Sequence, residues 1–107
     1  MRYIGKNLYL VVVHDYKDEG ALQRRLGARE KHLERATKAV KTGSMRCGGP
    51  LVDSHENGKM VGSALIVEAS SENEVHQIIK EDPYIEAKVW EKWDIYPYRN
   101  AVGLNNS

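Results

Sequence analysis

Residues 7–14 read NLYLVVVH, and this stretch decides the fold. It is rich in Leu, Val and Tyr, is too short for a helix and is followed by polar residues, so it predicts a β-strand. Both alternating sets of its side chains are apolar: Leu8, Leu10 and Val12 on one face, Tyr9, Val11 and Val13 on the other. A strand that is apolar on both sides is normally covered on both sides. We therefore expect a sheet with helices on one face and a partner on the other.

A long helix is predicted for residues 21–42, which contain no proline and are followed by Gly43 as a stop signal. At about 100° per residue its larger apolar side chains form a narrow stripe. We expect this stripe to be buried; it consists of Leu22, Leu26, Leu33 and Val40. Along one flank of it lie two guanidinium groups and an imidazole, those of Arg25, Arg29 and His32.

Three more strands and one more helix complete the pattern. Residues 45–52 and 60–69 predict two strands joined by a hairpin, since the connection contains the pair Asn57-Gly58. A capping box of Ser71 and Glu74 predicts the start of a second helix, which Pro83 ends. Residues 89–98 predict the last strand, with Trp90 and Trp93 on opposite faces.

The predicted order is β-α-β-β-α-β. It indicates an α+β, ferredoxin-like fold with a four-stranded antiparallel sheet. At 107 residues we expect a single domain over 1–107, with its core at about 7–98. Because two helices cover only one face of such a sheet, the apolar open face predicts a homodimer.

Composition excludes several classes of protein. Hydrophobic residues make up 41% and charged residues 29%, as in an ordinary globular domain. The longest apolar run, residues 8–13, is far shorter than a membrane span. A net charge of +1 argues against a nucleic-acid partner, and residues 62–69 lack the aromatics on which RNA-binding sheets of this topology stack bases. We expect neither a membrane nor a nucleic-acid partner.

Cysteine and histidine usage narrows the chemistry. Cys47 is the one cysteine, so no internal disulfide forms, and a reducing, cytoplasmic location is expected. We expect its thiol to be buried in its strand. The four histidines lack the close spacing typical of zinc sites, which predicts no metal. Charge is split locally: residues 21–41 carry seven basic and two acidic side chains, and residues 68–86 carry one and six. We expect these two segments to dock on each other.

Four short motifs resemble the YCII-related family. They are Arg29-x-x-His32-Leu33, Gly49-Pro50, Asp82-Pro83-Tyr84 and the late Pro97, and Asp15 after the first strand also fits. The likeness runs from about Leu8 to Pro97. It implies a dimeric α/β-barrel, in which two four-stranded sheets face each other. A few members of that family resemble lyases and isomerases acting on small oxygenated rings. The His-Asp pair regarded as the family's active centre corresponds to His32 and Asp82.

The residue types fit proton transfer without a cofactor. An imidazole is the side chain best suited to take and return a proton near neutral pH, and a carboxylate at Asp82 would orient that of His32. Arg25 or Arg29 would hold an anionic oxygen of a small-molecule substrate. Main-chain groups near Gly49 would assist, because glycine lets a ligand approach the backbone. Pro50 and Tyr84 complete the expected substrate-binding set.

Each of these residues also has a structural interpretation. His32 can be interpreted as a solvated histidine or one at the edge of the core. Asp82 can be interpreted as a turn residue, and Tyr84 as a side chain that fills the core. Two functions therefore remain open. One is a cytoplasmic enzyme of the lyase or isomerase type on a small oxygenated cyclic compound. The other is a non-catalytic dimeric module of the same fold that binds a metabolite or serves assembly.

Overall fold

The computed structural model describes residues 6–104, and its elements follow the predicted order with one short helix added. They are β1 (Asn7–Asp15), α1 (Ala21–Thr42), β2 (Met45–Val52), β3 (Met60–Ala69), α2 (Glu72–Lys80), α3 (Pro83–Glu86) and β4 (Trp90–Tyr98). The four strands form one sheet in the order β2-β3-β1-β4, with antiparallel neighbours throughout. The α+β, ferredoxin-like prediction is confirmed.

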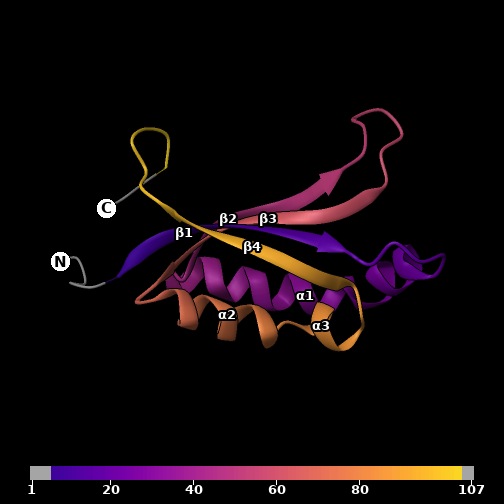
Figure 1. Cartoon of the computed structure of the whole chain (residues 1–107), viewed down its shortest axis with the longest axis horizontal. Coiled ribbons are helices and arrows are strands. Elements are labelled where there is room, and N and C mark those ends of the chain that lie inside the picture. The colour runs from indigo at the N-terminus through magenta and orange to yellow at the C-terminus, as the bar shows by residue number, and fades with distance from the viewer. Residues whose placement is uncertain (1–5, 105–107) are drawn as a thin grey trace.

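The helices lie together against one face of the sheet, and the β2–β3 hairpin extends beyond the body of the molecule (Figure 1). Tyr9, Val11 and Val13 of β1 are buried in the core between sheet and helices. The alternate side chains of β1 are only half-buried on the other face. None of the helices within residues 6–104 has the length and apolar character needed to cross a membrane.

Local signals place the ends of the helices. Gly43 takes the left-handed conformation (φ 89°) that ends α1. The hydroxyl of Ser71 accepts a hydrogen bond from the backbone N–H of Glu74, which starts α2. The second half of the predicted capping box differs, because the Glu74 carboxylate accepts from the N–H of Ser70 and not of Ser71. Pro83 ends α2 and also occupies the first turn of α3, where its missing N–H has no cost.

The predicted buried face of α1 is wrong. Leu26, Leu33 and Val40 are 48%, 42% and 51% exposed, whereas Arg25 and His32 are buried. The face against the sheet carries alanines and these two polar residues at spacings of three and four: Ala21, Arg25, Ala28, His32, Ala36 and Ala39. The small side chains let the helix approach the sheet, and the two polar groups find buried partners there.

Two other expectations on side-chain burial fail. Trp90 and Trp93 both pack on the helix side of β4, because the β1–β4 pairing shifts register between His14 and Asp15 and reverses the alternation. Cys47 is exposed on the edge strand β2 and is not buried.

Candidate functional site

A cavity of about 250 Å³ lies between α1 and the β2–β3 side of the sheet. Six of the seven predicted site residues line it: Arg25, Arg29, His32, Gly49, Pro50 and Tyr84. Asp82 is outside the lining and lies buried behind His32. Gly48, Gly49 and Pro50 line the cavity from within the continuous strand β2.

His32 and Asp82, which the resemblance pairs, are in direct contact. Nδ1 of His32 lies 2.9 Å from both carboxylate oxygens of Asp82. The Nε2 atom of His32 makes no hydrogen bond to any residue between 6 and 104, and the ring borders the cavity. The contact therefore ties one ring nitrogen to the protein and leaves the other for a ligand.

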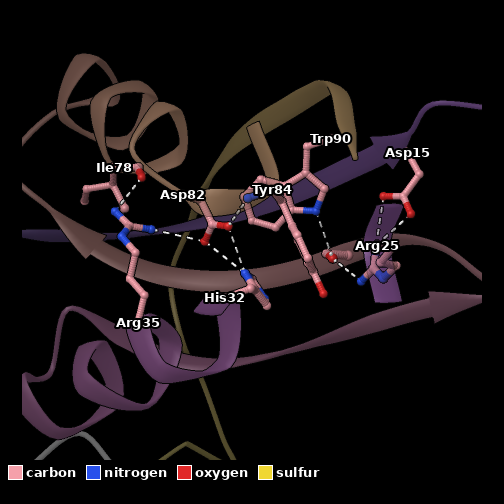
Figure 2. A network of polar contacts seen from close by, with 9 residues as sticks. Asp15, Arg25, His32, Arg35, Ile78, Asp82, Tyr84 and Trp90 are labelled. Carbon is pink, nitrogen blue, oxygen red and sulfur yellow. Dashed lines mark hydrogen bonds and ion pairs between the residues drawn. The ribbon is translucent and has the colours of Figure 1, made fainter. Parts of the chain in front are cut away.

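Asp82 is held from three directions (Figure 2). Besides His32, its carboxylate accepts from the backbone N–H of Tyr84 at 2.9 Å and from Nη1 of Arg35 at 3.2 Å. Arg35 is itself anchored by a 2.7 Å hydrogen bond from Nη2 to the carbonyl of Ile78 on α2. The position of the Asp82 carboxylate is set by its neighbour in sequence. Pro83 favours an extended conformation at Asp82, which makes Asp82 the N-cap of α3.

Arg35 was not among the predicted site residues. The charge split between residues 21–41 and 68–86 was the signal that could have found it. The two segments do meet at this point, where Arg35 contacts Asp82 and lies 3.7 Å from Glu81.

Tyr84 links the two halves of the site. Its ring stacks on His32 with centroids 4.0 Å apart and 12° between the planes, and Trp90 meets both rings edge-on. The guanidinium carbon of Arg25 lies 4.9 Å from the centre of the Tyr84 ring. Burial raises the pKa of the Tyr84 hydroxyl, and the charges of Arg25 and Arg29 oppose that rise. The phenol therefore stays protonated at neutral pH.

Arg25 belongs to a second buried network. Its Nη1 contacts both carboxylate oxygens of Asp15 at 2.7 and 2.9 Å, and its Nη2 donates to Ser63, which also accepts from Nε1 of Trp90. Burial raises the pKa of Asp15, while the hydrogen bonds and charge of Arg25 act in the opposite direction. Of the three guanidinium nitrogens of Arg25, Nε is the one that has no hydrogen-bond partner among residues 6–104.

The two arginines therefore differ in what they can offer a ligand. Arg25 is fixed by Asp15 and Ser63 and its unpaired Nε is buried, so it contributes positive charge beside the cavity. Arg29 is exposed, lines the cavity and forms no hydrogen bond or ion pair with the rest of the described chain. Arg29 therefore has a guanidinium fork that no group of the described chain engages. Among residues 6–104, no group of three or more His, Cys, Asp or Glu is arranged to hold a metal ion.

Known proteins resemble this chain over most of its length. The family model of the YCII-related domain matches residues 9–99. Protein YciI of Escherichia coli O6:H1 is 31% identical over 98 residues, which cover 88% of this chain and 98% of that protein. Derivative of benzaldehyde biosynthesis cluster protein C of Emericella nidulans is 35% identical over 68 residues, covering 59% of this chain and 69% of that protein.

A solved structure resembles the fold as well. It is 5-chloro-2-hydroxyhydroquinone dehydrochlorinase (TftG) from Burkholderia phenoliruptrix AC1100, in complex with 2,5-dihydroxybenzoquinone. The TM-score is 0.73 with 28% identity, over 88% of this chain and 95% of the other. Because the family model matches residues 9–99 and Protein YciI is 31% identical over 98% of its own length, the chain belongs to the YCII-related family.

Proposed function

We propose that this protein is a small-molecule enzyme that uses His32 to move a proton on a hydroxylated cyclic compound, in a lyase or isomerase reaction. The observation that carries this proposal is the attachment of His32 Nδ1 to a buried carboxylate while the same ring borders a cavity. The likeness to a dehydrochlorinase bound to a dihydroxybenzoquinone supports a ring substrate.

Proton transfer begins at Nε2 of His32. With the Nδ1 proton donated to Asp82, Nε2 carries the free lone pair and accepts a proton from a C–H or O–H of the substrate. The imidazolium that forms is stabilised by the Asp82 carboxylate at 2.9 Å. Arg35 and the N–H of Tyr84 fix that carboxylate in place.

The electron pair left on the substrate has two outcomes. In a lyase reaction it forms a double bond and expels a leaving group from the neighbouring carbon as an anion. In an isomerase reaction the same pair takes the proton back from His32 at a different atom. In both cases the intermediate is an enolate, whose negative oxygen suits the guanidinium of Arg29 and the hydroxyl of Tyr84, with the charge of Arg25 nearby.

The test uses a ring that carries both a hydroxyl and a leaving group, with 5-chloro-2-hydroxyhydroquinone as the first probe. We expect chloride release by the wild type, a loss of about 10²–10⁴-fold in turnover for His32→Gln, and no change for His55→Gln, which alters an exposed histidine of the hairpin. Turnover that survives in His32→Gln would overturn the proposal. Binding without turnover by the wild type would favour the non-catalytic metabolite-binding module.

We also propose that two copies of the chain pair through their open sheet faces, as in a dimeric α/β-barrel. Leu10 is the centre of an apolar row across that face, because it pairs with Ile66 on one side and with Tyr96, which is 51% exposed, on the other. No helix of the described chain covers this row (Figure 1). Burying it against an identical row removes apolar surface from water.

Sedimentation velocity at micromolar concentration tests this pairing. We expect a species of twice the chain mass for the wild type and a monomer for Leu10→Lys, because a buried lysine without a partner is costly. A wild type that sediments only as 12.1 kDa would contradict the dimer.

A further inference from the structure

The cavity has two chemically different ends. Helix α1 lines it from Arg25 to Val40, a distance of about 22 Å at 1.5 Å per residue. Its first part contributes Arg25, Arg29 and His32, and its later part contributes Leu33, Ala36, Thr37 and Val40.

The wall formed by β2 and β3 also changes from polar to apolar in this direction. Strand pairing places Pro50 beside Ser63, then Gly48 beside Leu65, then Met45 beside Val67. Ser63 bonds to Arg25 and so marks the polar end. Met45 follows α1 after a two-residue connection and marks the apolar end. Apart from Thr37 near the apolar end and Met60 near the polar end, the lining therefore changes from hydrogen-bonding groups to hydrocarbon along both walls.

The apolar end is accessible. Leu33 and Val40 line the cavity and are 42% and 51% exposed, so their surface is open to an occupant. Gly48 lies close to its neighbours in the opposite wall, since a Cβ there would come within 2.9 Å of Leu65 Cδ2 and 3.2 Å of Met45 Sδ. Any larger residue at position 48 would crowd the wall between the two ends.

We propose that the ligand is amphipathic. Its hydroxylated ring binds at the Arg29, His32 and Tyr84 end, and an apolar substituent of several carbons extends along Leu33 and Val40. This inference rests on the proposed function, because the ring occupies the position from which His32 takes a proton. It adds that the natural substrate is larger than a simple hydroxylated ring and carries a hydrocarbon side chain.

Binding calorimetry with a graded series tests the side chain. The probes are 2,5-dihydroxybenzoquinone and its 3-propyl and 3-pentyl derivatives, measured with the wild type, Val40→Gln and Leu26→Gln. Leu26 is the matched control, because it belongs to the same helix, is similarly exposed at 48% and does not line the cavity. We expect affinity for the wild type to rise by up to about fourfold per added methylene. We expect the same dependence in Leu26→Gln and a much weaker one in Val40→Gln.

The outcomes separate the two claims. Equal affinity for all three probes in the wild type would overturn the apolar side chain and leave the proposed function standing. A chain-length dependence that is unchanged in Val40→Gln, or lost equally in Leu26→Gln, would place the chain outside the cavity and also overturn it. Absence of binding by every probe, including the unsubstituted quinone, would overturn the ring position of the proposed function and this inference with it.

Discussion

Replacing Asp82 with Asn isolates the charge of the carboxylate behind His32. Asn preserves the size of the side chain and is a good N-cap, so the N–H of Tyr84 keeps an acceptor at the start of α3. What disappears is the negative charge 2.9 Å from His32 Nδ1. We therefore expect the fold to persist and the hold on the imidazole to weaken.

The magnitude follows from that contact. A hydrogen bond to a charged group contributes about 1.5–3 kcal/mol, and each 1.36 kcal/mol is a factor of about ten in rate. The carboxylate acts most strongly on the imidazolium that forms during proton transfer. Turnover should therefore fall by roughly 10–150-fold, less than the loss of about 10²–10⁴-fold expected when the imidazole itself is removed.

The assay combines turnover of the chlorinated ring with nitrogen NMR of the His32 side chain. In the wild type we expect the neutral ring to carry its proton on Nδ1, which faces Asp82. In Asp82→Asn a larger share should carry it on Nε2, because the amide of Asn can donate to Nδ1. The control is Glu81→Gln, which alters the neighbouring, exposed acid that also lies near Arg35. Turnover in Asp82→Asn within about twofold of wild type, with an unchanged tautomer, would refute the orienting role of Asp82.

Three further predictions concern the groups around this pair. Asp15→Asn removes the counter-charge of the buried Arg25, so the free energy of unfolding measured with urea should fall by about 3–5 kcal/mol. The double variant Asp15→Leu with Arg25→Met should lose less stability, because it leaves no buried charge without a partner. Equal losses in the two variants would contradict this role of the ion pair. Arg35→Gln should barely change stability, because Arg35 is partly exposed, but should lower turnover several-fold, with partial rescue in Arg35→Lys; no difference between Gln and Lys would argue against positioning by charge. Burial raises the pKa of Tyr84 above 10, so the folded state holds the phenol proton more tightly than the unfolded chain, and stability should be lost as pH rises from 10 through the folded-state pKa; denaturation of Tyr84→Phe should lack this component.

The regular elements were predictable because their signals are local. The apolar alternation in β1, the Gly43 stop and the Ser71 cap each act within a few residues, and the bounds of α1, β2 and β3 match the sequence-based ranges. The order of these elements then indicated the ferredoxin-like topology. Pro83 predicts the end of a helix, and in the structure it is also the first residue of the short helix α3.

The sequence also predicted part of the candidate site. His32 and Asp82 were paired through the resemblance to the family, since no spacing rule joins positions fifty residues apart. The structure adds Arg35 and Ser63, and it gives Asp15, which had only fitted the family pattern, its contact with Arg25.

The buried face of α1 was decided by the tertiary structure alone. Periodicity favoured the leucines, because burying a large apolar side chain is usually worth more than burying a charged one. Here Arg25 and His32 are buried, since Asp15 and Asp82 meet them with hydrogen bonds at 2.7–2.9 Å. Those partners come from the end of β1 and the start of α3. The sequence by itself determined that α1 is a helix with an apolar stripe and a polar flank. Only the packed fold, in which β1 supplies Asp15 and α3 supplies Asp82, determined that the flank faces inward and that Leu33 and Val40 of the stripe border the cavity.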